Sequence, residues 1–354
     1  MFSRNIPARN RISLGEGGNA LLELKHHDYK RLYILREDDN PSGSHKDRYM
    51  AYLLSALEDS SPRGYVISSS GNAGISLAKY SRHLNRPCII CLKPETSGAV
   101  IDKILSLGGN PLLTDKPINY SNIISRVTGY ANIRAGLNPL SCEGYRTIPA
   151  ELLEKGNIFD SLFMFSTSFS TVSGILDGYE QLRQRFETAV PRIFAVISGD
   201  FHPFSGEITR GPEEIAEGIH RINTSDNVEC LIIGSINRGL WNNEKKIGGF
   251  CSKERFRQVY SKLRKNNGCL VYAKDVNDPQ ADAFFRYYRI STSCHSACSI
   301  FSAYMLQKSG IVHAPLAIQS GSPPSDRQMV MFSEFYIKSL KELLNYLDKN
   351  HAER

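Results

Sequence analysis

Residues 40–48 read Asn-Pro-Ser-Gly-Ser-His-Lys-Asp-Arg and join a strand-like apolar run at 32–35 to a helical apolar pattern at 49–57. Lys46 is therefore expected where a loop opens a helix. Free helix N–H groups and the positive end of the helix dipole favour an unprotonated amine there, and partial burial lowers the pKa of a lysine. Lys46 is thus the candidate Schiff-base lysine. These nine residues alone fit equally well with Lys46 and Arg48 as exposed charges after a Pro-Ser-Gly turn.

The composition is that of a globular protein. Of 354 residues, 41% are hydrophobic and 22% are charged, and the chain is long enough for two lobes around a large core. No unbroken apolar run is long enough to cross a membrane, and residues 1–11 lack the apolar block of a secretion signal. We therefore expect a cytoplasmic protein with no membrane partner.

The charged residues and the cysteines do not indicate nucleic-acid or metal binding. The net charge of +7 is spread along the chain, and the densest basic segment, 253–265, has the apolar spacing of an amphipathic helix with a solvated charged face. We expect no nucleic-acid partner. Of the eight cysteines, Cys88 and Cys91 have a C-x-x-C spacing, but they lie in an apolar strand pattern with no second such pair. We expect buried thiols there and no metal site.

Short apolar runs alternate with helical patterns along most of the chain. This order predicts an α/β fold with two lobes, built from open, mostly parallel sheets flanked by helices. We place a large domain at 1–48 and 140–354 and a small domain at 49–139. The expected strands are 65–67, 88–92, 162–165, 193–197 and 316–319, and the expected helices are 75–83, 100–107, 172–185 and 299–306.

Four loops carry the groups best suited to binding. Residues 68–74 combine serines, glycines and an asparagine at a helix start, which suits a carboxylate, although serine-rich loops also serve as plain caps. Residues 166–174 gather hydroxyls at another helix start, where they either hold a phosphate group or are ordinary loop filler. Ser320 follows the last expected strand, where its hydroxyl could bond a ring nitrogen. Residues 143–147 are explained by a glycine turn before a proline that starts a helix.

Together these segments resemble the fold type II pyridoxal-phosphate enzymes, which include threonine synthase, threonine and serine dehydratases, cysteine synthase and cystathionine β-synthase. Residues 40–48 are similar to the lysine motif of that group, and 69–74 are similar to its substrate-carboxylate loop. Three further segments are most similar to threonine synthases, namely 14–19, 138–147 and 215–219. The matches run from about Leu14 to Ser322 in the family's order, so the set is more specific than any single motif.

The resemblance implies pyridoxal 5'-phosphate as cofactor, a small-molecule amino acid as substrate, and a homodimer. It implies that Lys46 forms the Schiff base and later moves the substrate's α-proton, and that Ser320 faces the pyridine nitrogen. A neutral hydroxyl at that nitrogen suits elimination and replacement chemistry. The implied substrate contacts are Ser69, Ser70, Asn72 and the Ala73 amide, with Asn72 also at the ring hydroxyl, and the implied phosphate contacts are Thr167, Ser168, Phe169, Ser170 and Thr171.

The phosphate segment departs from the family because residues 167–171 contain no glycine. Side chains larger than hydrogen disfavour left-handed backbone conformations. Either this loop takes another shape, with hydroxyls in place of some N–H contacts, or the phosphate site has decayed. The intact lysine and asparagine motifs favour the first alternative.

Three further departures concern the substrate and the rim of the site. Ser141 stands where threonine synthases usually carry an arginine for the substrate's phosphate, which puts O-phosphohomoserine in doubt. His45 replaces an apolar or aromatic residue, and we expect it to pack beside the lysine rather than act as a second acid–base group. Val271 to Tyr288 look inserted, as a cover for the active-site mouth or as a dimer contact.

The resemblance implies a pyridoxal-phosphate-dependent lyase or synthase that abstracts the α-proton and then eliminates or replaces a side-chain leaving group. A γ-elimination of the threonine-synthase type is the first expectation. A β-elimination or β-replacement on a serine derivative, as in dehydratases and cysteine synthases, is the alternative. A catalytically inactive homologue that serves as a binding module is a third hypothesis, motivated by the glycine-free loop. The sequence leaves the substrate, the second nucleophile and the oligomeric state open.

Overall fold

The computed structural model describes residues 11–25, 31–69, 71–136, 138–156, 158–197, 208–224, 228–233, 253–273, 279–321 and 337–352. These residues form two compact units. The first unit takes its described residues from Met1–Glu16, Pro41–Gly144 and Pro323–Arg354. The second unit takes its described residues from Gly17–Asn40 and Tyr145–Ser322.

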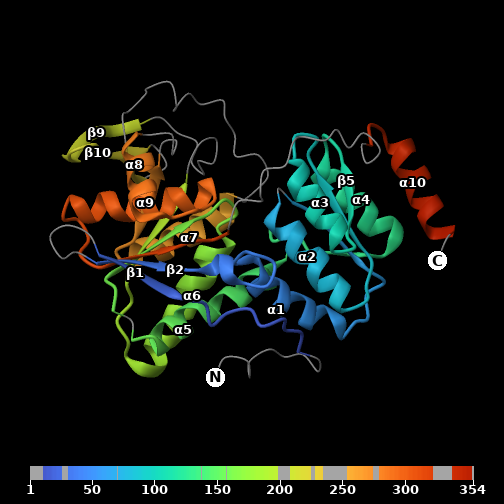
Figure 1. Ribbon diagram of the computed structural model, residues 1–354, viewed down its shortest axis with the longest axis horizontal. Coiled ribbons are helices and arrows are strands. Elements are labelled where there is room, and N and C mark those ends of the chain that lie inside the picture. Colours follow the sequence, from blue (N-terminus) through green and yellow to red (C-terminus); the bar gives the residue numbers. More distant parts are fainter. Residues whose placement is uncertain are drawn as a thin grey trace. The chain divides into compact units, whose positions relative to one another are not determined.

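The described part of the first unit contains a parallel sheet with the strand order β5-β4-β3-β6. Its strands are β3 (Tyr65–Ser68), β4 (Cys88–Leu92), β5 (Asn110–Leu113) and β6 (Ala131–Asn132). Helices flank the sheet, as Figure 1 shows for α2, α3 and α4. The helices are α1 (Lys46–Glu58), α2 (Asn72–His83), α3 (Gly98–Ser106), α4 (Pro117–Thr128) and α10 (Leu340–Ala352).

Helix α4 covers one face of this sheet with apolar side chains. Tyr120 and Ile124 pack in one cluster with Val66 and Ile89 of the strands. Cys88 and Cys91 are buried free thiols within β4, so the prediction of buried strand cysteines is confirmed. Burial raises the pKa of the Cys91 thiol, which keeps it protonated and unreactive.

The second unit contains, in its described residues, a larger sheet with the order β1-β2-β13-β7-β8-β12-β11-β10-β9. The six strands from β2 to β11 pair in parallel, and β1, β10 and β9 add antiparallel pairs at the two edges. The strands are β1 (Leu21–Lys25), β2 (Arg31–Leu35), β7 (Ser161–Phe165), β8 (Arg192–Ile197), β9 (Ile208–Ala216), β10 (Ile219–Thr224), β11 (Glu229–Ile233), β12 (Cys269–Ala273) and β13 (Pro315–Ile318).

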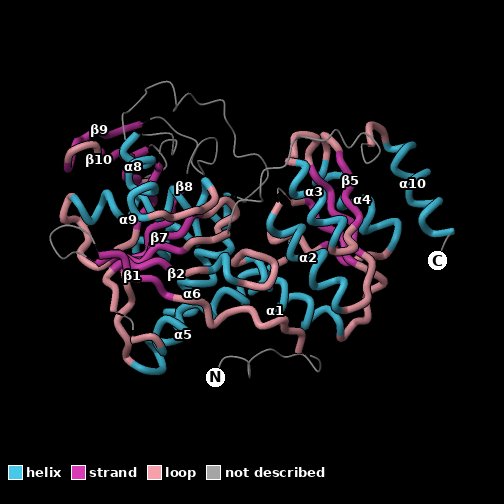
Figure 2. Tube along the Cα trace, viewed as in Figure 1, coloured by secondary structure: helices cyan, strands magenta, loops and turns pink. Residues whose placement is uncertain are grey.

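Helices cover the parallel part of this sheet, and Figure 2 shows the strands in magenta among them. The helices are α5 (Thr147–Glu154), α6 (Ser170–Phe186), α7 (Lys253–Lys265), α8 (Pro279–Tyr288) and α9 (Cys294–Lys308). Because both faces are covered, β7 and β13 are buried along their whole length, and apart from Ser161 they are apolar throughout. The predicted α/β fold with mostly parallel sheets is confirmed, as are the predicted strands and helices, with ends that move by a few residues.

The segment 271–288, expected to be an insertion, includes residues of the second unit's core, and its expected role as a cover or a dimer contact stays a prediction. Val271 to Ala273 continue β12, which pairs in parallel with β8 on one side and β11 on the other. Residues 274–278 lie outside the described residues. In α8, Ala281 and Phe284 are buried in the same apolar cluster as the strands. The segment therefore contributes a central strand and two core side chains, while most of the other described residues of α8 are exposed.

The two units differ from the domains expected at 1–48 with 140–354 and at 49–139, whose boundaries stay a prediction. The first unit includes the segment from Pro41 onward because α1 packs against α2. Lys46, the first residue of α1, therefore belongs to the same unit as the 69–74 loop.

Gly144 fixes the contact between the segment after Asn138-Pro139 and the lysine helix. A Cβ at this position would lie 2.1 Å from the backbone carbonyl oxygen of Arg48 and 2.7 Å from the Cα of Tyr49. No side chain can occupy that space unless the backbone of α1 moves. The glycine of the 143–147 motif thus serves close packing on α1, two residues from Lys46.

We expect Gly144→Ala to destabilise the protein by about 3 kcal/mol, because the new methyl group meets backbone atoms. Urea unfolding measures the change. Gly108→Ala is the matched control: its φ of +80° strains an alanine, but no atom lies within 4 Å of the new Cβ, so about 1–2 kcal/mol is expected. An equal loss in both variants would contradict the close packing against Arg48.

Candidate functional site

Lys46 opens helix α1 directly after a loop, as the sequence predicted. The loop is held by the next residue, Asp47, whose Oδ2 accepts from the Ser42 N–H at 2.6 Å and whose Oδ1 accepts from the Ser42 hydroxyl at 2.5 Å. Gly43, with φ of +92°, makes the turn between Ser42 and the helix. The path of the chain into Lys46 is thereby fixed.

The same Asp47 carboxylate also ties helix α2 to the lysine loop. Its Oδ1 accepts a second hydrogen bond, at 2.5 Å, from the hydroxyl of Ser76, which lies one turn after Asn72 on α2. Burial raises the pKa of Asp47, and the hydrogen bonds from Ser42 and Ser76 lower it in part. One carboxylate therefore joins the segment of Lys46 to the segment of Asn72 within the first unit.

The surroundings of the Lys46 amine make it easier to deprotonate than an exposed lysine. The residue is partly exposed, but the protein around the amine removes it from water, and this burial lowers the pKa of Lys46 to about 8. The neighbouring His45 is 5% exposed, which fits the packing role expected of it. An acid–base role for His45 stays a hypothesis.

The 69–74 loop uses its first serine to shape itself. The Ser69 hydroxyl oxygen accepts from Gly71 N–H at 3.1 Å and from Gly74 N–H at 3.0 Å. Gly71 has φ of +148°, and a Cβ on Gly74 would lie 2.6 Å from Ile90 on β4. Ser69 thus acts as a cap at the start of α2, which is the structural role that serine-rich loops often have. Its contact with substrate stays a prediction.

Two further predicted substrate contacts, Asn72 and Ala73, lie at the start of α2. Asn72 is the first residue of the helix, Ala73 is the second, and both are half-buried. Ser70 lies outside the described residues. The N–H groups of the first helical turn have no partners within the helix, so this turn suits a carboxylate.

In the second unit, three neighbouring parallel strands have their carboxyl ends on the same side of the sheet. β13 pairs in parallel with β2 on one side and with β7 on the other. Ser320 follows β13, and residues 167–171, the hydroxyl loop, follow β7. The side chain of Gln319 donates to Asp38 Oδ2 at 2.9 Å and so ties the end of β13 to the segment after β2. Carboxyl ends of parallel strands are where open α/β sheets place ligands.

The hydroxyl loop keeps one left-handed residue although it has no glycine. Phe169, the residue before α6, has φ of +57° and ψ of 6°. That conformation costs a non-glycine residue about 1–2 kcal/mol. The Phe169 ring is 1% exposed and lies edge-on to Phe256 of α7 at 5.5 Å, and burial of a phenylalanine contributes about 1.5–3 kcal/mol. Packing of the ring therefore offsets the strain.

The hydroxyls of this loop gather at the positive end of α6. Ser168 donates to the Ser170 hydroxyl at 3.2 Å, and Thr171 is buried beside them. Arg255 of α7 also donates to the Ser170 hydroxyl, at 3.1 Å. Hydroxyl donors, a helix N-terminus and a guanidinium form a donor set that fits a phosphate group.

Ser320 is part of a serine cluster at the start of α9. Its hydroxyl is 3.1 Å from the Ser296 hydroxyl, which is 2.9 Å from that of Ser293, the residue that caps α9. A hydroxyl near a helix N-terminus suits a neutral ring nitrogen and disfavours a protonated one. This donor set therefore fits the pyridine nitrogen expected there.

Sequence reasoning missed Ser293, Ser296 and Arg255. The Ser-x-x-Ser spacing at 293 and 296 is a capping signal, but the helix was expected to begin only at Ser299. Arg255 was assigned to the solvated face of an amphipathic helix, and no local signal shows that this helix lies beside the hydroxyl loop.

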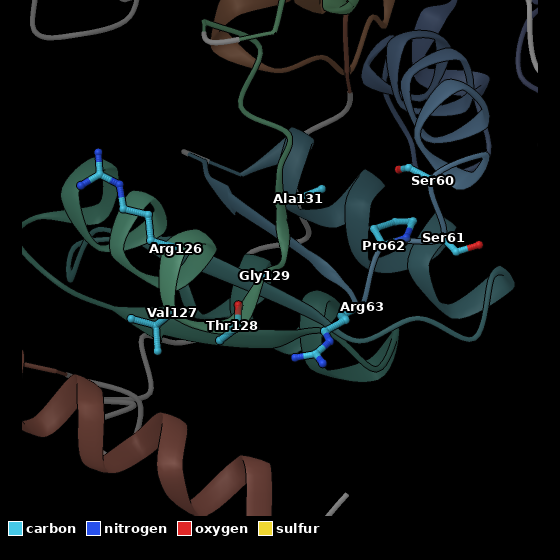
Figure 3. A pocket seen from close by; sticks show the side chains of 9 residues that line it. All are labelled: Ser60, Ser61, Pro62, Arg63, Arg126, Val127, Thr128, Gly129 and Ala131. Atoms are coloured by element: carbon cyan, nitrogen blue, oxygen red, sulfur yellow. The ribbon is translucent and has the colours of Figure 1, made fainter.

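A hollow of about 590 Å³ in the first unit contains none of the predicted site residues. It is lined by Ser60, Ser61, Pro62, Arg63, Arg126, Val127, Thr128, Gly129 and Ala131. Figure 3 shows the Arg63 and Arg126 guanidinium groups on different sides of it, so they do not converge on one ligand position.

The described residues form neither a metal cluster nor a membrane span. No three His, Cys, Asp or Glu side chains among them lie close enough together to hold a metal ion. None of the helices in the described part of the chain combines the length and apolar character needed to span a bilayer.

Comparison with known proteins gives a family match over residues 12–237, to the model described as pyridoxal-phosphate dependent enzyme. The chain is 26% identical over 181 residues to threonine synthase of Methanocaldococcus jannaschii. The alignment covers 48% of this chain and 44% of that protein. It is 30% identical over 125 residues to the serine dehydratase-like protein of Homo sapiens, which covers 34% of this chain and 38% of that protein. The chain thus matches less than half the length of either relative.

Solved structures share the fold at low identity. A pyridoxal 5'-phosphate-dependent aspartate racemase aligns with a TM-score of 0.64 and 17% identity, covering 90% of this chain and 94% of that one. Maize serine racemase aligns with a TM-score of 0.61 and 16% identity, covering 94% of this chain and 93% of that one. At these identities the likeness shows the fold alone.

We expect Lys46 of the cofactor-free protein to be acylated at a lower pH than exposed lysines, because only the neutral amine reacts and burial lowers its pKa to about 8. Labelling at a series of pH values, followed by peptide mass spectrometry, should give half-maximal modification near pH 8. The exposed Lys93 is the internal control. Identical pH profiles for the two lysines would contradict the burial effect.

We expect Asp47→Asn to destabilise the protein by about 1–3 kcal/mol, because its amide places N–H groups against buried donors from Ser42 and Ser76. Urea unfolding is the measurement. Asp102→Asn, at an exposed position on α3, is the matched control and should change stability little. A stability equal to that of the unmodified protein would show that Asp47 does not hold the two segments together.

Proposed function

The chain belongs to the pyridoxal-phosphate dependent enzyme family, and on that premise we propose that it is a lyase or synthase acting on an amino acid. The reaction begins with loss of the α-proton and continues with elimination or replacement of a side-chain leaving group. The observation that carries the proposal is Lys46, at the start of α1, with its pKa lowered to about 8 by burial. Such an amine is partly neutral near neutral pH, as covalent attachment to an aldehyde requires.

The family's cofactor is pyridoxal 5'-phosphate, and each part of it has a proposed partner in this chain. Lys46 would bind it covalently, Asn72 would contact its ring hydroxyl, and Ser320 would face its ring nitrogen. The hydroxyl loop would bind its phosphate group. The chemistry that the cofactor supplies when bound is withdrawal of electrons from the bonds at the substrate's α-carbon.

The chain's own groups would then bind the substrate and move the proton. The first turn of α2, with Asn72 and the Ala73 amide, would hold the substrate carboxylate together with Ser69 and Ser70. Once displaced by the substrate's amino group, the Lys46 amine would accept the α-proton. A base whose pKa is close to the working pH transfers protons efficiently in both directions. The Ser320 hydroxyl, beside Ser296, would leave the ring nitrogen uncharged, which suits elimination and replacement chemistry.

Within this class we propose a γ-elimination of the threonine-synthase type first. The segments at 138–147 and 215–219 and the match to a threonine synthase support this choice. Against O-phosphohomoserine stands Ser141, which is fully buried and donates to the Ala135 carbonyl at 2.8 Å. β-elimination or β-replacement on a serine derivative is the second candidate, and Ser141 is the observation that favours it. The homodimer implied by the resemblance stays a prediction.

Arg134 is the group that we propose to contact an anionic leaving group. It follows β6, which pairs in parallel with β3, and the adjacent Ile133 N–H donates to Val66. Arg134 therefore lies at the edge of the sheet where the 69–74 loop follows β3. Burial lowers the pKa of Arg134, yet an arginine keeps its charge, so the guanidinium can bind a phosphate or carboxylate.

The test is turnover of purified, cofactor-loaded protein with O-phosphohomoserine, O-phosphoserine and O-acetylserine. We expect release of phosphate or acetate, and we expect Lys46→Ala to lower the rate about a hundredfold or more, because it removes the proton-transfer group. A preference for the two serine derivatives would replace γ-elimination by the β-chemistry. Protein that stays colourless with added pyridoxal phosphate would support the inactive binding module instead.

We expect Arg134→Gln to lower turnover of the phosphorylated substrates about tenfold or more, and to change turnover of O-acetylserine little, because only the phosphate esters present a dianion. The comparison of kcat/KM across the three substrates gives the result. Arg126→Gln, at an exposed position in the last turn of α4, serves as the arginine control. Equal losses on all three substrates would show that Arg134 does not contact the leaving group.

A further inference from the structure

The hydroxyl loop is in contact with a cation that no sequence motif predicts there. Arg255, on α7, donates from Nη1 to the Ser170 hydroxyl at 3.1 Å. Ser170 is the first residue of α6 and belongs to the segment proposed for the cofactor's phosphate. Both residues lie in the second unit.

The contact follows from the missing glycine. Phe169 occupies the left-handed position before α6, and its buried ring packs edge-on against Phe256, the residue next to Arg255. Phe256 in turn stacks on Tyr260 one turn along α7, with ring centroids 5.8 Å apart. A glycine in place of Phe169 would have no ring to hold α7 here. The side chain that replaces glycine therefore brings an arginine to the loop.

The Ser170 hydroxyl acts as the acceptor in two hydrogen bonds, so its own hydrogen can be donated to another group. Its oxygen accepts from Arg255 and from the Ser168 hydroxyl, so its own hydrogen is available to a further acceptor. A hydroxyl that accepts two hydrogen bonds, one from a cation, is a stronger donor to an anion. The start of α6 adds the positive end of a helix dipole at the same position.

Asp177 is the acidic residue of α6 nearest to Ser170 in the sequence, and it is paired with other cations. Asp177 is 2.5 Å from Lys262 and 3.7 Å from Arg146. The positive charge of Arg255 lies beside the hydroxyl loop through its hydrogen bond to Ser170.

We propose that Arg255 is a cofactor-binding residue whose guanidinium, through and beside Ser170, holds the phosphate group of pyridoxal 5'-phosphate. The inference rests on the proposed function, since it needs the phosphate to bind at the hydroxyl loop. A glycine-rich loop binds phosphate with backbone N–H groups. In this chain a fixed cation and oriented hydroxyls take their place.

The test compares a ligand that has the phosphate group with one that lacks it. Cofactor-free protein is titrated with pyridoxal phosphate and, separately, with pyridoxal, which has the same aldehyde but no phosphate, and binding is followed by absorbance. We expect Arg255→Gln to weaken pyridoxal phosphate binding roughly ten- to hundredfold and to leave pyridoxal binding unchanged. Arg255→Lys, which keeps the charge but loses the planar fork, should fall between.

The matched control is Arg257→Gln, an exposed arginine two residues along the same helix, which should bind both aldehydes like the unmodified protein. A second readout is the phosphorus NMR signal of the loaded protein during a pH titration. The guanidinium favours the phosphate dianion and lowers its second pKa, so that pKa should rise in the Arg255→Gln variant.

The possible results distinguish the role of Arg255 from the proposed function of the protein. Equal affinity for pyridoxal phosphate in Arg255→Gln and Arg257→Gln would overturn the role of Arg255 and leave the proposed function standing. Equal weakening of pyridoxal phosphate and pyridoxal would also overturn it, because the residue would then act on the fold and not on the phosphate. Failure of the unmodified protein to bind pyridoxal phosphate would overturn the proposed function itself.

Discussion

The carboxylate of Asp47 accepts hydrogen bonds from both Ser42 and Ser76, and the arrangement of the first unit's site residues depends on it. Its neighbour Lys46 is fixed in direction because the loop before it and the helix after it share this one acceptor. Asn72 lies one turn before Ser76, so it is fixed by the same group. A buried carboxylate with donors from two segments is costly to leave unsatisfied, which is why the two segments stay together.

The second unit meets a different constraint at its sheet edge. β2, β13 and β7 are parallel neighbours, so the segments that follow them begin at one side of the sheet. Two of these segments carry serines that belong to clusters at helix starts, Ser320 beside the start of α9 and Ser170 at the start of α6. Both clusters present neutral hydroxyls at the positive ends of helices, and the second also has a hydrogen bond from an arginine, Arg255. The hydroxyl cluster at Ser320 fits a neutral ring nitrogen, and the cluster at Ser170, which has the arginine, fits a charged phosphate.

Much of the fold could be predicted from the sequence because its signals are local. Apolar runs such as β4 and β7 are buried on both faces, and the loop-to-helix junction at Lys46 has its own turn and helix residues. The contacts between segments could not be predicted this way. That Val271 to Ala273 lie in a central strand could not be predicted either, since β12 pairs with β8, about 75 residues earlier in the chain, and with β11. The clamp by Asp47 and the approach of Arg255 to Ser170 likewise join residues far apart in sequence.

The most direct test of the proposed function is to identify the residue that carries the cofactor. Reduction of the loaded protein with borohydride fixes any cofactor–lysine bond, and digestion with peptide mass spectrometry then locates it. We predict a single modified peptide, with the added mass on Lys46. Modification of a different lysine, or of none, would contradict the assignment of Lys46.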